Sequence, residues 1–444
     1  MDLAVVGLGK LGSPLAAVLA SKGHNVYGID LNHYFVDALN EGRAPVVEPQ
    51  LQELIDANRS RIRATTRFEE AIPHTDISFV IVPTPSMEDG AFTNRYVVAA
   101  VESIGKALRG VDRYHVVNIT STVMPGSTGG EIREALEAAS GKKVGVDVGL
   151  TYNPEFIALG SVVRDLLYPD MLLIGESDPR AGDVLEAVYK KTVMSNPPVQ
   201  RMNWVSAEIT KIAVNTYVTT KISYANMLAE LCDRLPGADV DVVSSALGKD
   251  SRIGSKYIKG ALGYGGPCFP RDNRAFATLA RRVGAPAHIA EATDAINNRQ
   301  IARVADMVSR AAKKGAKAAV LGMSYKPNTP VVEQSQGVMI ARELAERGFK
   351  VTVYDPVALS NAMAELQGFA LRAADAQSAV EDADVVVIAT PSAEYRDIPA
   401  AAFGREGGPR RLVIDCWRLL DAESVRKHAE LVHLGFGETP RAGA

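Results

Sequence analysis

The stretch that decides the fold is LAVVGLGKLGSPLAAVLASKGHNVYGID, residues 3–30. A short apolar run is followed by Gly-x-Gly-x-x-Gly, then by a segment with helical spacing, and then by a second apolar run, NVYGID. The order is therefore strand, glycine turn, helix, strand. Such an order is typical of the first unit of a parallel α/β sheet.

The glycines of this turn are Gly7, Gly9 and Gly12. The first permits the tight turn, the second lets the backbone approach a pyrophosphate, and the third allows close packing of helix on strand. Asp30 ends the second strand, where a carboxylate accepts hydrogen bonds from both ribose hydroxyls and repels a 2′-phosphate. The motif predicts a dinucleotide site that favours NAD over NADP. The plainer interpretation is that the glycines serve only a turn and Asp30 only a strand end.

Further buried strands are predicted in the N-terminal part of the chain, where they alternate with helical stretches such as RYVVAAVESIGKALRG, residues 95–110. The strand-like runs are DISFVIVPTP (76–85), YHVVNITSTVMPGS (114–127), VGLTYNPEF (148–156) and MLLIGES (171–177). This alternation predicts a mostly parallel, doubly wound sheet.

The pattern changes after SNPPVQ, residues 195–200, where paired prolines mark a boundary. A helical segment is predicted over 204–235, and between Ile212 and Ala229 it carries one charge, Lys221. A helix that is apolar on nearly every side is buried against other helices or against another subunit. Both interpretations stay open, with a shared dimer core favoured over an internal core helix.

After residue 300 the alternation returns, with a helix predicted over SQGVMIARELAERG, residues 335–348. The strand-like runs are KAAVLGMSYKPNT (317–329), FKVTVYDP (349–356), ADVVVIATPS (383–392) and RLVIDCW (411–417). The last of these is expected to be the final strand, and GFGETPRAGA, residues 435–444, a frayed tail. This half lacks Gly-x-Gly-x-x-Gly, so any nucleotide that it binds is held differently.

The predicted architecture is α/β, with two doubly wound, Rossmann-like domains joined by a central helical dimerisation region. The expected boundaries are 1–198 for a domain that binds NAD, 199–299 for the helical domain and 300–444 for a second nucleotide-binding domain.

Composition excludes several classes of protein. Of the 444 residues, 47% are hydrophobic and 23% charged, and the formal net charge is -3, which gives no electrostatic footprint for nucleic acid or an anionic membrane. No apolar run approaches the roughly 20 residues that cross a bilayer, and no secretory signal is expected. The cysteines Cys232, Cys268 and Cys416 are widely spaced, which argues against disulfides and a zinc site. A reducing cytoplasm and no metal are expected.

Cys268 lies in GYGGPCFPRD, residues 263–272, where three glycines and two prolines are expected to form a loop. The glycines allow the backbone to approach a ligand, and the neighbouring cation Arg271 lowers the pKa of a thiol. A reactive thiol beside NAD can oxidise an aldehyde through a thioester. Cys232 and Cys416 are expected to be small buried hydrophobic residues.

Two further patterns suggest polar groups at a site. AEITKIAVN, residues 207–215, places Lys211 and Asn215 on one helical face, where a cation and an amide can hold an oxyanion or a water. Taken singly, Lys211 would more often be a solvated helix residue. Glu155 follows an Asn-Pro turn at the carboxyl edge of the sheet, where α/β active sites lie, although a plain turn residue is an equal interpretation.

With these residues the chain resembles the nucleotide-sugar dehydrogenase family, which includes UDP-glucose, GDP-mannose and UDP-N-acetylmannosamine dehydrogenases. The motifs occur in the family's order along nearly the whole chain: GLGKLG, VPTP, STVMPGST, NPEF, AEITKIAVNTYVTTKIS, RIGSKYIKGALGYGGPCFPRD and SYKPNT. The resemblance implies a four-electron oxidation of a primary alcohol to a carboxylate with two NAD molecules in turn.

The resemblance also implies catalytic roles. Cys268 matches the nucleophile that captures the aldehyde as a thiohemiacetal, which hydride transfer converts to a thioester. Lys211 and Asn215 match the pair that stabilises the alkoxide and oxyanions, and Asp272 matches the carboxylate that orders Lys211 and a water. Glu155 matches the general base of thioester hydrolysis. A further match, Thr122, is implied to position the catalytic water.

Binding residues follow from the same resemblance. Lys326 matches a contact to the nucleotide diphosphate, and Arg252 an arginine that reaches the nucleotide sugar of a neighbouring subunit, so a homodimer or higher oligomer is implied. Further cofactor contacts, besides Thr122 and those of the glycine turn, are implied at Leu11, Pro83, Thr84 and Ser121. Further contacts to the nucleotide sugar, besides Glu155, Lys211 and Asn215, are implied at Phe156, Tyr257, Lys259, Gly265 and Arg418.

Three positions depart from the family pattern. Leu159 stands where a second acidic residue is usual, so any assistance from that carboxylate is absent or supplied elsewhere. Glu333 stands where an arginine contacts cofactor phosphate, which bears on NAD affinity. Arg418 lies one position later than the arginine of the commoner Asp-Gly-Arg pattern, which bears on its contact with substrate.

UDP-glucose is the leading expected substrate. The GYGGPCFPRD loop resembles the glucose and mannose branches of the family, since Pro267 stands where the N-acetylmannosamine branch tends to have a histidine. GDP-mannose and UDP-N-acetylmannosamine remain alternatives. A two-electron 3-hydroxyacid dehydrogenase shares the glycine motif and the helix with lysine and asparagine, but has no need of the loop thiol. A non-catalytic protein that binds NAD or senses nucleotide sugars is a third hypothesis, motivated by Leu159 and Glu333.

Overall fold

The apolar run at the N-terminus forms β1 (Asp2–Val6), an inner strand of an eight-stranded sheet. Side chains alternate along a strand, so Leu3 and Val5 cluster with α1 (Gly12–Ser21) on one face. Ala4 and Val6 cluster with α4 (Arg95–Ala107) on the other. A strand with both faces buried reads as a continuous apolar run, which is why the sequence revealed it.

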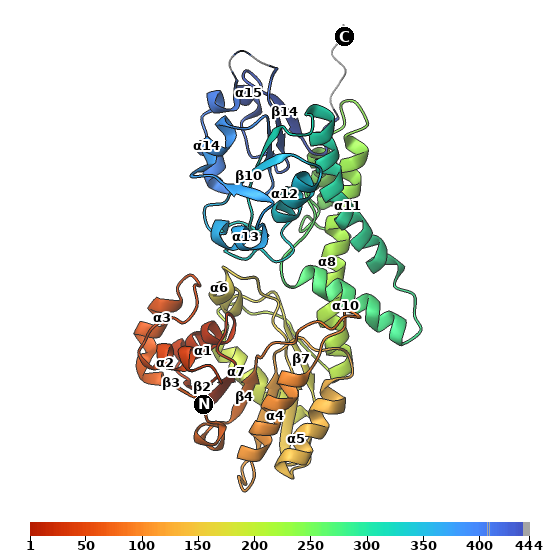
Figure 1. Ribbon diagram of the computed structural model, residues 1–444. Coiled ribbons are helices and arrows are strands. Elements are labelled where there is room, and N and C mark those ends of the chain that lie inside the picture. Colours follow the sequence, from red (N-terminus) through yellow and green to blue (C-terminus); the bar gives the residue numbers. More distant parts are fainter. Residues whose placement is uncertain (406, 408, 438–444) are drawn as a thin grey trace. The chain divides into compact units, whose positions relative to one another are not determined.

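The computed structural model describes residues 1–405, 407 and 409–437, and these form two compact units, Met1–Ala213 and Val214–Ala444 (Figure 1). The first unit holds the eight-stranded sheet, which is parallel except between β6 and β7. In spatial order its strands are β3 (Ile62–Thr65), β2 (Asn25–Ile29), β1, β4 (Ile77–Val80), β5 (His115–Ile119), β6 (Val148–Tyr152), β7 (Leu172–Glu176) and β8 (Val199–Met202).

Helices cover both faces of this sheet, which confirms the doubly wound class. Residues of α1, α3, α6 and α7 pack in the cluster on one face, and residues of α4 and α5 in the cluster on the other. The helices not yet given bounds are α2 (His33–Asn40), α3 (Leu51–Asn58), α5 (Arg133–Ser140), α6 (Val162–Leu167) and α7 (Pro179–Thr192).

The sequence did not reveal the two edge strands, β3 and β8. Each is only partly buried and carries polar residues among its apolar ones, so the apolar run is broken. β8 follows the paired prolines and pairs with β7, so this sheet extends beyond residue 198. The predicted domain boundaries themselves remain a prediction.

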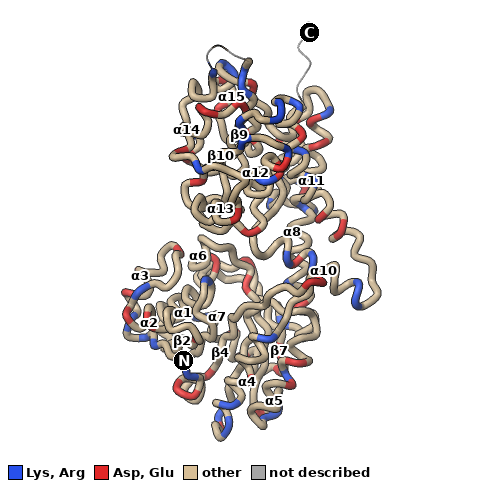
Figure 2. The backbone as a smooth tube through the Cα atoms, in the orientation of Figure 1, with Lys and Arg blue, Asp and Glu red and all other residues tan. Residues whose placement is uncertain are grey.

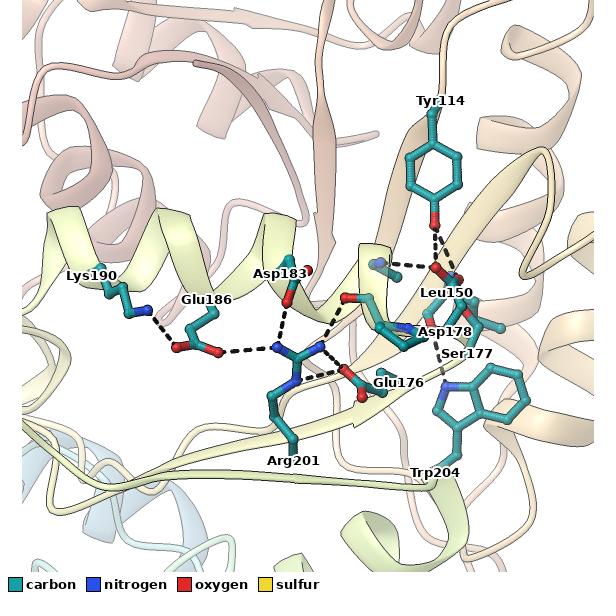
Figure 3. A network of polar contacts seen from close by, with 12 residues as sticks. Tyr114, Leu150, Glu176, Ser177, Asp178, Asp183, Glu186, Lys190, Arg201 and Trp204 are labelled. Carbon is teal, nitrogen blue, oxygen red and sulfur yellow. Dashed lines mark hydrogen bonds and ion pairs between the residues drawn. The ribbon is translucent and has the colours of Figure 1, made fainter.

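An ionic network fixes the polar edge strand β8 to its neighbours (Figure 3). Arg201 on β8 donates from Nε to Glu176 of β7 at 2.8 Å and from Nη1 to Asp183 of α7 at 2.5 Å. Glu186, also on α7, accepts from Arg201 at 3.3 Å and pairs with Lys190 at 2.7 Å. Charge pairing thus supplies at this edge the attachment that apolar packing supplies at the inner strands.

The second unit holds a six-stranded sheet in which every pair of neighbouring strands is parallel. In spatial order its strands are β11 (Ala370–Arg372), β10 (Lys350–Tyr354), β9 (Lys317–Leu321), β12 (Val385–Ile388), β13 (Leu412–Asp415) and β14 (Glu430–His433). The four predicted strands are confirmed. β11 was not predicted, and the expectation that β13 is the final strand is wrong, because the short edge strand β14 follows it.

The predicted tail is ordered at its start. Gly435 accepts from the amide of Val240 at 2.8 Å, and Gly437 exchanges hydrogen bonds of 2.9 Å with Gly237 and Ala238. These backbone bonds make the prediction of a frayed tail wrong for residues 435–437. Residues 438–444 lie outside the described part of the chain.

In both sheets the turn after the first strand in the chain has the same glycine conformation. Gly7 and Gly322 follow the first strand of their sheets with φ of 97° and 99°, and each donates to the end of the second strand at 2.8 Å. A Cβ on Gly12 would lie 1.7 Å from the oxygen of Gly7, and one on Gly337 would lie 1.9 Å from that of Gly322. The second sheet therefore repeats the turn with a longer loop, which hid it from the sequence motif.

The helix predicted over 204–235 is present as α8 (Trp204–Cys232), which begins in the first unit and ends in the second. Several of its apolar side chains are exposed, among them Tyr217 (67%), Tyr224 (49%) and Leu231 (50%). The other helices of the second unit are α9 (Val240–Lys249), α10 (Phe269–Arg282), α11 (His288–Ala311), α12 (Gln336–Glu346), α13 (Leu359–Glu365), α14 (Ala376–Glu381) and α15 (Ala422–Val425).

Charges of both signs are mixed along the described part of the chain (Figure 2). Figure 2 shows Lys and Arg interspersed with Asp and Glu along both units. None of the helices in the described ranges is long and apolar enough to cross a membrane.

Candidate functional site

The first glycine turn leaves its backbone open where a pyrophosphate would approach. A Cβ on Gly7 would lie 2.8 Å from the oxygen of Ile81, so a side chain is excluded there. At Gly9 a Cβ would meet nothing within 4 Å, so this backbone faces open space. α1 begins at Gly12 directly after Leu11, and its N-terminal amides and dipole favour an anion. The turn fits the diphosphate of a dinucleotide.

Asp30 follows β2, and backbone amides use half of the acceptor positions on its carboxylate. Oδ2 accepts from the amide of Leu8 at 2.7 Å, and Oδ1 from that of Asn32 at 2.8 Å. A carboxylate oxygen has two lone-pair sites, so each oxygen retains one acceptor position. These two free positions are what a ribose diol requires.

Asp355 occupies the corresponding place after β10, but donors of the protein already use the acceptor positions of its carboxylate. It is 3% exposed, and five donors reach it. The donors are the amides of Met323, Ser324, Val357 and Ala358 and the hydroxyl of Ser324, at 2.7–3.0 Å. This strand end has no acceptor left for a ribose.

The loops after β4 and β5 bond to each other. Thr84 donates from Oγ1 to the oxygen of Thr122 at 2.7 Å, and Ser121 donates from Oγ to that of Val82 at 2.6 Å. Thr84 and Ser121 are buried, whereas Pro83 is exposed. Parallel strands end at one edge of a sheet, so these residues lie at the same edge as the glycine turn. The structure thus gathers the residues expected to bind cofactor.

Glu155 and Phe156 follow β6, also at this edge, and both contact Lys211. The ammonium of Lys211 donates to the backbone oxygen of Glu155 at 2.5 Å and lies 4.5 Å from the centre of the Phe156 ring. Lys211 is 7% exposed, so the interpretation of a solvated helix residue is wrong. A cation held against an aromatic face and a carbonyl is fixed in direction.

The carboxyl of Glu155 has a partner that the sequence did not reveal, Tyr189 on α7. The phenol lies 2.8 Å from Oε1 of Glu155 and 2.5 Å from Oδ1 of Asn153, and the ring is 2% exposed. Burial raises the pKa of Glu155, while Tyr189 and then Lys211 lower it. A carboxyl with a raised pKa next to a fixed donor suits proton transfer.

Cys268 lies at the start of a helix rather than in the middle of a loop. The expected loop ends at Cys268, because α10 begins at Phe269 and Pro270 is tolerated in a first turn where its missing N–H has no partner to lose. Cys268 is exposed, whereas Cys232 and Cys416 are buried, as predicted for them. A thiol at a helix N-terminus is stabilised as the thiolate.

Asp272, in the first turn of α10, is hydrogen-bonded to Asn215 of α8. The amide nitrogen of Asn215 donates to Oδ2 of Asp272 at 2.6 Å, and Nε of Arg271 donates to Oδ1 at 3.1 Å. Asp272 is fully buried, and its backbone N–H donates to the oxygen of Cys268 at 2.8 Å. The carboxylate is therefore held by two donors beside the turn that carries the thiol.

The glycines before Cys268 allow the segment 325–334 to pack directly against them. Gly266 has φ of 85°, and a Cβ there would lie 2.5 Å from the ring of Tyr325. The amide of Gly266 donates to the oxygen of Glu333 at 2.9 Å, and a Cβ on Gly265 would lie 2.2 Å from that of Gln334. Burial, with Cys268 and then Glu333 nearby, raises the pKa of Tyr325 to about 12. Glu333 thus supports this loop through its backbone.

The residues expected to bind nucleotide sugar vary in exposure. Arg252, Tyr257 and Lys259 are exposed on the irregular segment between α9 and α10, and Arg252 pairs with Asp250 at 2.6 Å. Tyr257 has φ of 65°, a conformation that L-residues rarely adopt. Lys326 is half-buried, with Nζ 5.8 Å from the ring centre of Tyr325.

Arg418 is held by several groups of the second unit. Its guanidinium donates to Asp239 at 2.6 Å and to the oxygens of Leu434 and Gly435 at 3.3 and 3.1 Å. Asp241 lies 3.2 Å away. Arg418 thus binds the start of α9 to the C-terminal segment, and its contact with substrate stays a prediction.

The gathered residues form two groups. Glu155, Phe156 and Lys211 belong to the first unit, and Cys268 and Asp272 to the second. Helix α8 carries Lys211 and, one turn later, Asn215, so it contributes to both groups. In the described part of the chain, no cluster of His, Cys, Asp and Glu fits a metal ion.

Comparisons with known proteins agree with this arrangement. Residues 1–193 match the NAD binding domain of the UDP-glucose/GDP-mannose dehydrogenase family, residues 205–299 its central domain, and residues 319–422 its UDP binding domain. The UDP-glucose 6-dehydrogenase AglM of Haloferax volcanii is 35% identical over 436 residues, 97% of this chain and 100% of that protein.

Two further relatives show the breadth of the similarity. A GDP-mannose 6-dehydrogenase of Pseudomonas savastanoi is 33% identical over 359 residues, 80% of this chain and 81% of that protein. A solved UDP-glucose dehydrogenase from Pyrobaculum islandicum superimposes with a TM-score of 0.89 at 34% identity and covers 98% of each chain. The chain therefore belongs to the UDP-glucose/GDP-mannose dehydrogenase family, whose members oxidise nucleotide sugars with NAD as the cofactor.

Proposed function

We propose that this protein oxidises UDP-glucose to UDP-glucuronate in two successive NAD-dependent steps that share Cys268. The observation that carries the proposal is an exposed thiol at the N-terminus of α10, one helical turn from a buried Asp272 held by Asn215. NAD supplies the acceptor for the hydride in each step. A two-electron dehydrogenase has no use for such a thiol.

The protons and hydrides of the proposed reaction steps balance with the residues present. The alcohol loses a proton and a hydride to give the aldehyde, with Lys211 and Asn215 stabilising the alkoxide. The Cys268 thiolate adds to the aldehyde carbon, and loss of a second hydride from this thiohemiacetal gives a thioester. Glu155 takes a proton from water, with Thr122 directing that water, and the attack releases the carboxylate and the thiol.

Binding roles follow the same plan. The glycine turn with Asp30 binds NAD, helped by the loops that carry Thr84, Ser121 and Thr122. Lys326 binds the nucleotide diphosphate, and Tyr257, Lys259 and Gly265 contact the nucleotide sugar. Arg252 supports contact across a dimer, because its guanidinium is exposed and its described ion pair, with Asp250, is a local one.

The test is a Cys268→Ser variant assayed with UDP-glucose and NAD. The wild type is expected to form two NADH per sugar consumed. The variant is expected to stop at the aldehyde, or at an ester on the hydroxyl that replaces the thiol, detected by intact mass after acid quench. Unchanged turnover in the variant, or one NADH per sugar in the wild type, would overturn the proposal. Cys232→Ser, at a buried cysteine, is the matched control.

GDP-mannose is the second candidate substrate, because a relative that covers most of this chain acts on it. A spectrophotometric screen of UDP- and GDP-hexoses decides between them. The proposal for UDP-glucose fails if GDP-mannose has the higher kcat/KM.

A further inference from the structure

Glu208 lies in the first half of α8, three residues before Lys211, and its side chain is fully buried. Oε2 accepts from the amide of Gly126 at 2.6 Å, and Oε1 accepts from that of Thr128 at 2.8 Å. Gly126 belongs to the loop that follows β5 and carries Thr122, and Thr128 begins the short helical segment η4 (Thr128–Ile132) into which this loop leads. Burial raises the pKa of Glu208, and the donors from Thr128 and Gly126 lower it. A buried carboxyl whose two oxygens each accept from one of these amides ties this segment to α8.

Glu208 shares one face of α8 with two other anchors. Trp204 donates from Nε1 to the oxygen of Leu150 in β6 at 3.1 Å (Figure 3), and Lys211 donates to the oxygen of Glu155 at 2.5 Å. Residues spaced by four and then three positions lie along one helical face. The helix thus holds the loops after β5 and β6 at a fixed separation, with Glu208 as its contact to the first.

The other end of the Thr122 loop is fixed independently. Thr84 holds the oxygen of Thr122 at 2.7 Å, and Ser121 bonds to Val82 at 2.6 Å. These contacts set where the loop leaves the sheet, and Glu208 sets where it returns to α5 through Gly126, whose φ is 95°. Thr122 is held between the two.

We propose that Glu208 is a positioning residue that holds the Thr122 loop in register with Lys211 and Glu155 for hydrolysis of the thioester. The inference rests on the proposed function, because the thioester does. It assigns to Glu208 an effect on the hydrolytic step that exceeds its effect on the two hydride transfers.

The test uses Glu208→Gln in the full chain with UDP-glucose and NAD. Glutamine keeps the shape but presents an N–H to one of the two loop amides, so one amide loses its acceptor. In rapid mixing we expect a burst of NADH followed by a steady state about tenfold slower or more, since a displacement of about 1 Å can cost about 100-fold. Acid-quenched enzyme should carry the sugar acid on Cys268, detected by intact mass.

Hydrogen–deuterium exchange reports the contact itself. The peptide that covers residues 120–130 should exchange faster in Glu208→Gln than in the wild type. Glu208→Asp keeps both acceptors on a shorter stem and should fall between the two in exchange and in burst size. Glu186→Gln is the control, since it removes a partly buried carboxylate of the same unit from the Arg201 network, and it should show no burst.

The outcomes separate the two proposals. A wild type that forms no NADH with any nucleotide sugar sinks the proposed function, and the role of Thr122 with it. An active wild type whose Glu208→Gln variant shows equal slowing of all steps, or none, overturns the inference, as does unchanged exchange over residues 120–130.

Discussion

At Glu155 a single phenolic proton faces two acceptors. Tyr189 lies 2.8 Å from the carboxyl of Glu155 and 2.5 Å from the amide oxygen of Asn153, and the amide nitrogen of Asn153 is already bonded to Leu173. When Glu155 is ionised, Tyr189 can satisfy only one of these oxygens. Burial of the carboxyl raises the pKa of Glu155, whereas donation to the ionised carboxyl lowers it.

This arrangement predicts a pH effect for Tyr189→Phe. The phenol lowers the pKa of Glu155 by donating to the carboxylate, so its removal should raise that pKa further. A general base works when deprotonated, so activity appears as pH rises through its pKa. The acidic limb of the kcat profile should move to higher pH in the variant. Steady-state kcat across the acidic and neutral pH range measures the shift.

Tyr114→Phe is the matched control, because Tyr114 also donates to a carboxylate, that of Asp178, at 3.1 Å. Its acidic limb should match the wild type. A limb that is unmoved in Tyr189→Phe, or that moves equally in both variants, contradicts the assignment.

The sequence revealed those site residues that stand out against their immediate neighbours. Cys268 is a thiol within a glycine-rich segment, and Lys211 is a cation near the start of an apolar helix. Tyr189 was not found, because its partner Glu155 is 34 positions away on another element and a tyrosine in an amphipathic helix has no distinguishing pattern. Glu208 belongs to the motif that carries Lys211, but its partners Gly126 and Thr128 are visible only in space.

At the scale of elements, the two ends of α10 offer a matched pair of glycines. Gly266 precedes the helix with φ of 85°, and a Cβ there would lie 2.5 Å from the ring of Tyr325. Gly284 follows the helix with φ of 74°, and a Cβ there would meet nothing within 4 Å. Both positions impose the same backbone strain on alanine, but only the first adds a collision.

Gly284→Ala should therefore cost about 1 kcal/mol of folding free energy through backbone strain alone. Gly266→Ala should cost about 1–3 kcal/mol more, because the ring of Tyr325 must move, and it should also lower kcat by displacing Cys268. Thermal unfolding and steady-state rates measure both. Equal destabilisation by the two variants would show that the contact with Tyr325 does not constrain the loop.

The edge strand β8 is expected to depend on Arg201. Arg201→Met leaves Glu176, Asp183 and Glu186 close together without their shared cation, and should cost about 1–3 kcal/mol of unfolding free energy. Substitution of Arg67, which forms an exposed ion pair with Glu69, should leave the free energy of unfolding unchanged. Urea unfolding compares them, and equal midpoints for Arg201→Met and the wild type would contradict this role.

Elements buried on two sides were predictable from sequence, and edges were not. β1, β4, β5 and β12 are mostly apolar and almost fully buried, because helices cover both of their faces. β3, β8 and β14 lie at the edges of their sheets and are only partly buried, so apolar and polar residues are mixed along them. The C-terminal segment 435–437 is held by backbone bonds, which leave no trace in residue type.

For the whole molecule, we expect a homodimer, because α8 carries an exposed apolar stripe. Tyr217, Tyr224 and Leu231 recur every seven residues, so they share one face of the helix, and each is about half exposed or more. Sedimentation at micromolar concentration should show a dimer. Tyr224→Arg should yield monomers and, if Arg252 acts across the interface, a raised KM for the nucleotide sugar.

Tyr34→Arg, at an exposed tyrosine of the first unit, is the control and should remain dimeric. A wild type that sediments as a monomer would refute both the interface and the part given to Arg252. The predicted boundaries after residues 198 and 299 are a separate matter, which limited proteolysis can test.

The fully occupied carboxylate of Asp355 bears on how acidic residues at strand ends are interpreted. Both sheets place an aspartate after their second strand, yet around Asp355 the protein's own amides and a hydroxyl take every lone pair. An acid at a strand end can therefore recognise a ribose only where the surrounding backbone leaves it acceptor positions. A survey that counted such acids by position would assign this protein two dinucleotide sites, although of these two aspartates Asp30 alone retains acceptor positions for a sugar.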